Sequence, residues 1–195
     1  MAASKGFWLK QVCNAALVGA VAFVVGGYYD KAADWKAHRV LVAVDPGHDV
    51  QSAAAGLKDE DFRQIDCLAR NMYFEARSQG QEGMKAVSDV VFNRLKSGLF
   101  PDSVCQIITQ CSPTSGVCQF SWFHDGRDHA IRDKAAWDLA YTIAYNEWLY
   151  HEKMPDSTGG ATRYHATYVS PAWGGWNQTV QIGLHRFFKP KAPQS

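Results

Sequence analysis

The sequence predicts an α+β protein, with a mainly helical body and a small antiparallel sheet near its C-terminal end, behind an apolar N-terminal segment. Three observations predict this class. Apolar residues recur at helical spacing through the middle of the 195-residue chain, alternating strand-like runs follow Thr158, and residues 11–29 carry no charged side chain. The chain therefore divides into an N-terminal segment, 1–29, a connector, 30–60, a folded body, 61–190, and a tail, 191–195.

The composition fits one globular domain with an appendage. Hydrophobic residues make up 47% of the chain, and 20 Lys and Arg against 19 Asp and Glu leave a formal charge of +1, with no run of like charge. Because non-specific binding to nucleic acid depends on clustered cations that neutralise phosphates, we expect no nucleic-acid partner. We expect the protein to be a monomer.

The N-terminal segment predicts export. Residues 11–29 lie between Lys10 and Asp30 and have the length of a membrane span, although Ala, Gly, Gln11 and Asn14 weaken it. A cleaved signal and an uncleaved signal-anchor both fit this pattern. We favour the anchor, with the N-terminus inside and the body in the periplasm against the inner membrane, because no clear small-x-small cleavage site follows the apolar stretch.

The cysteines agree with export. Cys13 lies in the apolar segment, whereas Cys67, Cys105, Cys111 and Cys118 lie in the body. An even set in a small body predicts two disulfides formed in an oxidising compartment, and the spacing leaves the choice among three pairings open. The spacings are not the Cys-x-x-Cys pairs of a structural zinc site.

The first helix of the body carries the main catalytic candidate. From Asp61 an apolar stripe recurs at helical spacing, through Phe62, Ile65, Ala69, Met72 and Ala76. Glu75 falls at the border of this stripe, so we expect a half-buried carboxylate whose pKa is raised by desolvation. Such a group can hold a proton near neutral pH and deliver it to a leaving oxygen. The alternative is a surface Glu paired with Arg77 or Arg70.

Further helices are expected after Glu75. Residues 78–81 have the form of a capping box that opens a second helix, which runs to Leu95 and is ended by Gly98 and Pro101. Residues 102–110 and 130–150 predict two more helices. The loop between them, 111–128, contains an aromatic run and is long enough to suggest a functional role.

The end of the chain predicts a small sheet. Residues 161–165, 179–182 and 183–188 alternate as strands, and the loop 171–176 carries two indoles. This sheet would present His165, Trp173, Trp176 and His185, although a structural role for each His is the commoner outcome.

Several motifs occur in order along the body. They are Cys67-Leu-Ala-Arg-Asn-Met-Tyr-Phe-Glu75-Ala-Arg77, Val-Val-Phe-Asn93-Arg94, Phe100-Pro101-Asp-Ser-Val-Cys105, Cys118-Gln-Phe-Ser-Trp122, Gly159-Gly-Ala-Thr-x-Tyr-His165 and Ile182-Gly-x-His185-x-Phe-Phe188. In these motifs the chain resembles the SleB-type cell-wall hydrolases from about Cys67 to Lys189. The resemblance implies a lysozyme-like α+β domain that cuts the glycan strand of peptidoglycan, with Glu75 as the catalytic acid/base.

One position departs from the family pattern. Where the family often has Ala-Arg-Gly-Glu after the catalytic Glu, this chain has Gln79 at the second acidic position. Hydrolases that retain or invert use two carboxylates, whereas a lytic transglycosylase needs one. The departure therefore favours transglycosylation, with Glu82 as an alternative second carboxylate that we interpret first as a helix-start residue.

We therefore expect a peptidoglycan lytic enzyme that cleaves between N-acetylmuramic acid and N-acetylglucosamine, with Glu75 as acid/base and no metal or cofactor. The expected lining of the glycan groove is Tyr73, Phe120, Ser121, Trp122, Tyr164, His165 and Trp173.

Two alternatives come from other features of the chain. The run Val-Ala-Val-Asp45-Pro46-Gly47-His48 resembles the opening of zinc-dependent N-acetylmuramoyl-L-alanine amidases, with His48, Glu60 and His124 as candidate ligands. That fold needs a larger α/β body and a further His on a strand. The other alternative is a non-catalytic wall-binding or spanin/holin-like membrane protein, in which residues 11–29 would be the functional part.

Overall fold

The computed structural model describes residues 56–171 and 174–191. The expected membrane segment, 1–29, most of the connector and the predicted groove residue Trp173 lie outside these residues. No helix in the described ranges is both long enough and apolar enough to cross a membrane.

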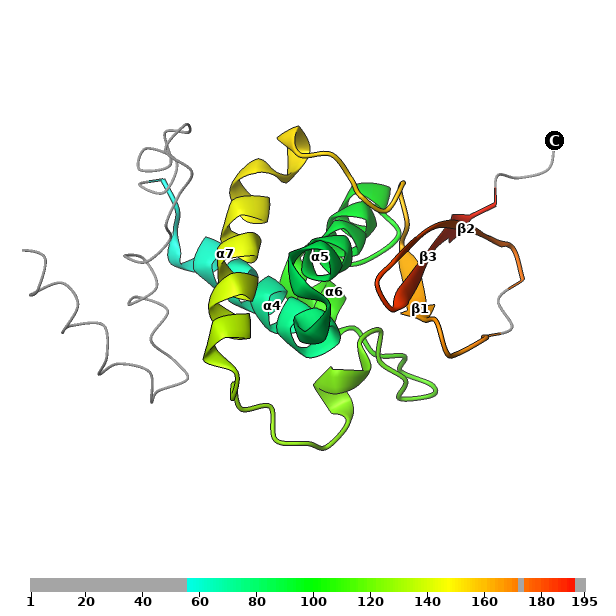
Figure 1. Ribbon diagram of the computed structural model, residues 1–195, viewed down its shortest axis with the longest axis horizontal. Helices are drawn as coiled ribbons and strands as arrows, with labels where there is room; N and C mark the ends of the chain where they lie inside the picture. The colour runs from blue at the N-terminus through cyan, green and yellow to red at the C-terminus, as the bar shows by residue number, and fades with distance from the viewer. Residues whose placement is uncertain (1–55, 172–173, 192–195) are drawn as a thin grey trace, which may run out of the picture. The chain divides into compact units, whose positions relative to one another are not determined.

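The described residues form a mainly helical domain with a small sheet, as the sequence predicts (Figure 1). The helices are α4 (Asp59–Ala76), η1 (Arg77–Gln79), α5 (Gly80–Ser97), α6 (Val104–Thr109), η2 (Ser121–His124), α7 (Lys134–Tyr150) and η3 (His151–Lys153). The strands are β1 (Arg163–Ala166), β2 (Trp176–Ile182) and β3 (His185–Pro190).

Helix α4 is the element against which the other helices pack. Its first turn is acidic, and Asp61 accepts a hydrogen bond from the backbone N of Lys58 at 2.7 Å, which satisfies one of the free donors at the helix start. Its apolar stripe, with Ile65, Leu68 and Met72 fully buried, contacts α5, α6 and α7. The helix begins two residues before the predicted Asp61.

The second helix starts differently from the prediction. The expected capping box at residues 78–81 does not form: η1 occupies Arg77–Gln79, and α5 begins at Gly80 with no side-chain cap. Gly80 has a φ of +66°, a conformation that other residues resist, so the chain turns sharply between the two helices. Gly98 ends α5 with a φ of +65°, as predicted.

The later helices are shorter than predicted because side-chain caps set their starts. Ser103 accepts a hydrogen bond from the backbone N of Gln106 at 3.3 Å, so α6 begins at Val104. Asp133 accepts one from the backbone N of Ala136 at 3.0 Å, so α7 begins at Lys134 and not at 130.

The three strands form one antiparallel sheet in the order β1-β3-β2. Phe187 of β3 is fully buried and packs with Ala86 and Val90 of α5 and with Ala161. This contact fastens the sheet to α5, and Figure 1 shows the sheet beside α5 on the side away from α7.

The two predicted disulfides are both present, and the structure gives their pairing. Cys67–Cys105 joins α4 to α6, and Cys111–Cys118 closes a short turn in the loop after α6. Backbone bonds reinforce that turn, because Ser112 N donates to Val117 O at 2.8 Å.

A buried charge cluster joins α5 to α7. Lys85 Nζ lies 2.7 Å from Asp89 Oδ1 and 3.4 Å from Glu147 Oε1. Asp89 also accepts hydrogen bonds from the backbone N of Ser157, at 2.9 Å, and from its hydroxyl. Burial raises the pKa of the Glu147 carboxyl, against the lowering effect of the Lys85 charge.

Candidate active site

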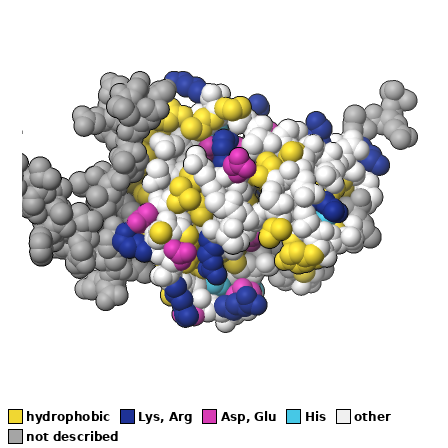
Figure 2. Space-filling view, viewed as in Figure 1, with side chains coloured by type: hydrophobic (Ala, Val, Ile, Leu, Met, Phe, Trp, Pro, Cys, Tyr) yellow, Lys and Arg dark blue, Asp and Glu magenta, His cyan; other side chains and the backbone are white. Residues whose placement is uncertain are grey.

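A cleft of about 930 Å³ lies between the C-terminal end of α4, the loop 112–129 and the sheet. Glu75 from α4, Trp122 from η2 and Tyr164 from β1 are among its lining residues. On the face shown in Figure 2, the described Lys and Arg side chains are interspersed with Asp and Glu. The lining residues thus bring a partly buried acid and aromatic side chains together in one concave site.

Glu75 lies at the penultimate position of α4, where the helix ends beside the cleft. The hydroxyl of Tyr164 donates a hydrogen bond to Glu75 Oε2 at 3.0 Å. Burial raises the pKa of the Glu75 carboxyl, and the Tyr164 hydrogen bond and the Arg94 charge act in the lowering direction. Glu75 is thus partly buried, as the helix spacing predicts, and its burial acts to raise its pKa.

The alternative of a surface ion pair at Glu75 is not what the structure shows. Arg70 pairs with Asp66, with 2.8 Å between Nε and Oδ2, one turn earlier on α4. Arg77 instead lies over the ring of Tyr73, with its guanidinium carbon 5.1 Å from the ring centroid.

Tyr164 is held in place by its neighbours on β3. Its ring centroid lies 4.8 Å from that of His185 and 5.6 Å from that of Phe187. Burial is the largest of the effects that raise the pKa of Tyr164 well above its usual value. Tyr164 therefore keeps its proton and acts as a hydrogen-bond donor to Glu75 at any pH near neutral.

Arg94 is a buried cation on the wall of the cleft. It is 3% exposed, and its Nε donates to the backbone O of Thr162 at 2.8 Å. Its guanidinium carbon lies 5.1 Å and 5.0 Å from the ring centroids of Phe100 and Phe120. Burial lowers the pKa of Arg94 to about 10, so it stays charged at neutral pH, and its Nη1 has no partner among the described residues.

An aromatic wall lies next to the acid. The rings of Phe74 and Trp122 stack with centroids 4.7 Å apart, and Trp122 Nε1 donates to Asn71 Oδ1 at 2.9 Å. These contacts fix the indole in the cleft. Tyr168, which also lines the cleft, is 83% exposed and offers a further flat face.

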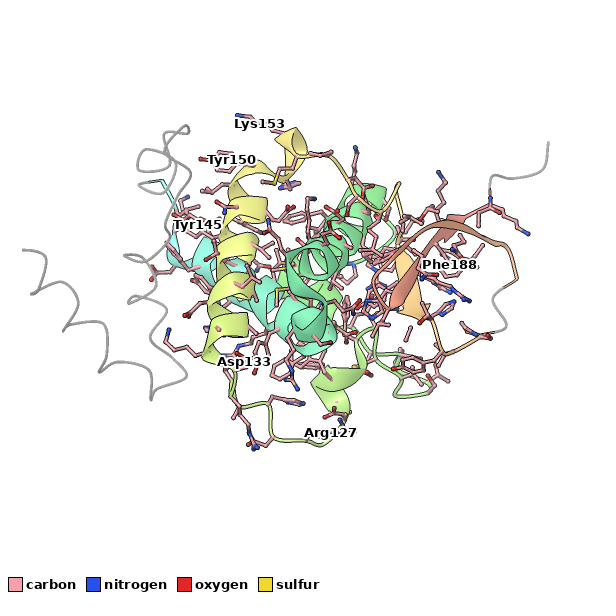
Figure 3. All side chains as sticks on the ribbon, in the orientation of Figure 1. Arg127, Asp133, Tyr145, Tyr150, Lys153 and Phe188 are labelled. Carbon is pink, nitrogen blue, oxygen red and sulfur yellow. A yellow bond between two sulfur atoms is a disulfide. The ribbon has the colours of Figure 1, made fainter. Side chains whose placement is uncertain are left out.

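The loop between η2 and α7 completes the lining. Arg127, labelled in Figure 3, lies on this loop, away from the strand that carries Phe188. Asp125 accepts a hydrogen bond from the backbone N of Arg127 at 2.9 Å, and this bond is the largest of the effects that lower its carboxyl pKa.

The structure places five of the predicted site residues in the cleft and two elsewhere. Those in the cleft are Glu75, Ser121, Trp122, Tyr164 and His165. Tyr73 and Phe120 are each 1% exposed and do not line it.

Tyr73 faces the core because its position continues the apolar stripe of α4. Its hydroxyl accepts hydrogen bonds from the backbone N of Arg132 and Asp133, at 3.1 and 2.9 Å. It therefore supports the loop before α7 and does not contact a ligand in the cleft. Phe120 packs beneath the cleft against Arg94 and Tyr164, with 6.4 Å between its ring centroid and that of Tyr164.

Sequence reasoning left several cleft residues out of the predicted site. They are Phe74, Arg77, Arg94, Asp125, Arg127, Asp128, His129, Arg163, Tyr168 and His185, among others. Arg94 and His185 lie in the family motifs, and that was the signal by which they could have been included.

The candidate zinc ligands are not brought together in the part of the chain that the structure describes. Glu60 lies in the first turn of α4 and pairs with Arg63, and His124 is exposed on η2. His48 lies outside the described residues. Across 56–171 and 174–191 no group of three or more His, Cys, Asp or Glu has the arrangement of a metal site.

The sequence profile of the cell wall hydrolase family matches residues 78–188. This chain belongs to that family. The match begins three positions after Glu75, so the role of Glu75 rests on its motif and on the geometry of the cleft.

The chain is similar to curated spore cortex-lytic enzymes. It is 32% identical over 127 residues to that of Oceanobacillus iheyensis, which covers 64% of this chain and 41% of the relative. It is also 32% identical over 137 residues to that of Bacillus subtilis, covering 68% of this chain and 38% of the relative. The chain thus spans about two fifths of the length of these relatives.

A solved structure shares the fold. The catalytic domain of the germination-specific lytic transglycosylase SleB from Bacillus anthracis superposes with a TM-score of 0.50 at 28% sequence identity. The match covers 69% of this chain and 98% of that chain. The helical body and small sheet described above therefore have the SleB catalytic-domain fold.

Proposed function

We propose that this protein cleaves the glycan strand of peptidoglycan between N-acetylmuramic acid and N-acetylglucosamine, as a lytic transglycosylase with Glu75 as acid/base. The observation that carries the proposal is the partly buried Glu75, held by Tyr164 on the wall of a large cleft. Membership of the cell wall hydrolase family supports peptidoglycan as the substrate, and the likeness to the SleB catalytic domain supports the reaction type.

The reaction needs one acid that acts twice. Protonated Glu75 donates its proton to the glycosidic oxygen, the bond from that oxygen to the anomeric carbon breaks, and a chain ending in N-acetylglucosamine leaves. The 6-hydroxyl of the muramic acid then attacks the anomeric carbon and returns its proton to the Glu75 carboxylate. The products are a 1,6-anhydro end and a regenerated acid, and no water is consumed.

The surroundings of Glu75 suit both halves of this cycle. Burial favours the protonated form that starts the reaction. The hydrogen bond from Tyr164 and the charge of Arg94 both favour the carboxylate that the first step leaves behind. Burial favours the protonated carboxyl, and the two contacts favour the ionised one. This balance suits a group that must first donate a proton and then accept one.

The other carboxylates near the site support a single-acid mechanism. Glu82 lies in the first turn of α5, is exposed and does not line the cleft. Asp125 and Asp128 line the cleft, but both are engaged in bonds that fix their loop: Asp125 with the backbone N of Arg127, and Asp128 with Arg132 Nη2 at 2.8 Å. Both carboxylates are therefore oriented by their own loop, and the product analysis described below tests whether either takes part in the reaction.

The site also supports a lysozyme-like interpretation of the domain. In it, an acid at the end of a helix is hydrogen-bonded to a small sheet and lines a cleft that a sugar chain can enter. Trp122 and Tyr168 offer the flat apolar faces against which pyranose rings pack.

Export and membrane attachment complete the proposal. The uncharged stretch 11–29 supports an inner-membrane anchor with the body in the periplasm, where the protein would act as a monomer. The two disulfides support an oxidising compartment. Fractionation during expression tests this: full-length protein in the membrane fraction supports the anchor, and a form shortened at about Tyr29 would show a cleaved signal instead.

The deciding experiment for the reaction is mass spectrometry of purified peptidoglycan after digestion. We expect fragments that end in 1,6-anhydro-N-acetylmuramic acid. A reducing N-acetylmuramic acid end would show a hydrolase, with Asp125 or Asp128 as the next candidate carboxylate. Release of free stem peptides, blocked by a zinc chelator and restored by zinc, would replace the proposal with the amidase. Absence of any cleavage would support the non-catalytic wall-binding alternative.

A further inference from the structure

Gln79 joins the start of α5 to the turn between β2 and β3. Its Oε1 accepts a hydrogen bond from the backbone N of Leu184 at 2.8 Å, and its Nε2 lies 3.1 Å from Nδ1 of His185. These partners lie 105 and 106 residues away in the sequence. Gln79 itself does not line the cleft, whereas His185 does.

The orientation of the Gln79 amide follows from hydrogen-bond chemistry. A backbone N–H can only donate, so the atom that faces Leu184 must be the amide oxygen. The amide nitrogen therefore faces His185, and because this nitrogen can only donate, Nδ1 of His185 must be the acceptor. A neutral imidazole that accepts at Nδ1 carries its proton at Nε2.

Two glycines leave the space that Gln79 occupies. A Cβ built at Gly183 would lie 2.5 Å from Gln79 Oε1, and one built at Gly83 would collide with Gln79 Cβ. Gly183 also has a φ of +54°, which lets the turn bring Leu184 toward the amide. The chain is thus shaped on both sides to receive this side chain.

We propose that Gln79 is a positioning residue that holds His185 neutral, with its proton on Nε2, so that His185 presents an N–H donor to the glycan in the cleft. This inference rests on the proposed function for the identity of the ligand. The acceptor it would meet is a hydroxyl or an acetamido carbonyl oxygen of a sugar next to the scissile bond.

The other groups around His185 act in the same direction. Burial is the largest cause that lowers the His185 pKa. The second cause is His165 on β1, which disfavours a positive charge on His185. The Tyr164 ring, also from β1, contacts the His185 ring, and its hydroxyl donates to Glu75. Arg186 is the next residue on β3, and Ile182 is the β2 residue paired with His185. The hydrogen-bond contact of His185 Nδ1 among the described residues is with Gln79 Nε2.

A glutamate at position 79 would reverse the arrangement. A carboxylate can still accept from the backbone N of Leu184, but its other oxygen would require a proton on Nδ1 of His185. Q79E should therefore raise the His185 pKa and, once the ring is neutral, leave Nε2 without a proton.

The direct test is nitrogen NMR of the histidine side chains in the full-length protein, with H185Q used to assign the His185 signals. At neutral pH we expect the His185 shifts of a neutral ring with unprotonated Nδ1 and protonated Nε2. In Q79E we expect a protonated Nδ1. A wild-type signal with the proton on Nδ1, or a fully protonated ring at pH 7, would overturn the inference whatever the activity shows.

Kinetics on peptidoglycan supply the second test. H185F removes the donor and should raise KM about 5- to 10-fold, while H185Q, whose amide can donate from a similar position, should recover at least half of that loss. In Q79E, kcat/KM should show a second decline as pH rises through the raised His185 pKa, in addition to the decline that the wild type shows as Glu75 ionises. Equal effects of H185F and H185Q would show a merely structural histidine.

A matched pair of glycine substitutions separates Gln79 from general damage to the fold. G183A displaces Gln79, whereas G98A imposes a similar left-handed strain, at a φ of +65°, with no atom within 4 Å of the added carbon. We expect G183A to shift the His185 signal and raise KM at least 3-fold, and G98A to do neither. If both behave alike, the role of Gln79 is excluded. An inactive wild type, or an active E75Q, would instead contradict the proposed function and leave the NMR result standing.

Discussion

Oε2 of Glu75 accepts a hydrogen bond from the hydroxyl of Tyr164 at 3.0 Å, across the space between the end of α4 and strand β1. The two residues are 89 positions apart in the sequence, and each is held by its own element. The bond fixes which carboxyl oxygen is turned toward β1. It therefore leaves Oε1 as the oxygen that can carry the transferable proton into the cleft.

The first prediction concerns Glu75 itself. E75Q keeps the shape of the side chain and removes its titrating proton, so wall lysis should fall at least about 100-fold. Because burial opposes ionisation of this carboxyl, the neutral amide should leave the melting temperature equal or higher at pH 7. Turbidity loss of purified walls and thermal melting measure the two effects.

The matched control is E82Q, the same substitution on an exposed residue in the first turn of α5. It should keep activity within about 2-fold of the wild type. Loss of lysis in E82Q equal to that in E75Q would restore Glu82 as a second catalytic carboxylate.

The second prediction is the pH profile. The acid must be protonated to start the reaction, so kcat/KM should fall as pH rises through the Glu75 pKa. That pKa is raised above its ordinary value of 4.5, so the fall should come at a higher pH than for an exposed Glu. Y164F removes a bond that favours the carboxylate, and it should move the fall to still higher pH while lowering kcat about 10-fold. A shift to lower pH in Y164F would contradict this account.

The third prediction concerns the exposed face of Tyr168 on the cleft wall. Y168A removes a side chain that is 83% exposed and touches little of the protein, so stability should not change, whereas KM should rise several-fold through lost contact with the glycan. L99A removes an apolar side chain that is 80% exposed outside the cleft and should leave both quantities unchanged. Steady-state kinetics should be measured on soluble glycan fragments. On these substrates a higher KM reports weaker binding in the cleft and not poor adsorption of the variant to whole walls.

The fourth prediction separates the two disulfides. Loop entropy assigns about 4 kcal/mol to Cys67–Cys105, with its separation of 38 residues, and about 2 kcal/mol to Cys111–Cys118, with its separation of 7. C67S/C105S should therefore lower the unfolding free energy more, as measured by urea denaturation.

The shorter bridge should matter more for activity, because Ser112, Ser115, Val117 and Cys118 line the cleft. We expect C111S/C118S to raise KM with a smaller loss of stability. The opposite ranking, with activity lost only in C67S/C105S, would show that the turn at 111–118 does not contact the substrate.

How much of the site the sequence predicts depends on how local the interactions are. Glu75 is predicted because helix periodicity is a property of neighbouring residues. The same periodicity places Tyr73 four positions after Ala69 and so inside the apolar stripe, a signal that should have assigned it to the core. The capping-box prediction at Ser78 fails because the pattern depends only on its first and last residues, whereas Gly80 between them imposes a turn.

Contacts between distant residues are not visible in the sequence. No local pattern indicates that Gln79 meets Leu184, or that Arg94 reaches Thr162 and the cleft. The disulfide pairing is a similar case, because spacing allows three pairings and only the packing of α4 against α6 selects one.

The last prediction concerns the buried charges between α5 and α7. The folded-state pKa of Glu147 is raised above its unfolded value, so ionising this carboxyl is harder in the folded protein than in the unfolded chain. Its contribution to stability is therefore largest below the unfolded pKa and declines as pH rises through the folded pKa. E147Q, which resembles the protonated form, should match the wild type in acid and become relatively more stable as pH rises toward neutral.

D89N is the contrasting variant, because Asp89 accepts hydrogen bonds from Lys85 and from both the backbone N and the hydroxyl of Ser157. Loss of this carboxylate should lower the free energy of unfolding by about 2–4 kcal/mol. Urea denaturation at several pH values measures both. An E147Q protein that loses stability relative to the wild type as pH rises would show that the Lys85–Glu147 attraction outweighs the burial of the carboxylate.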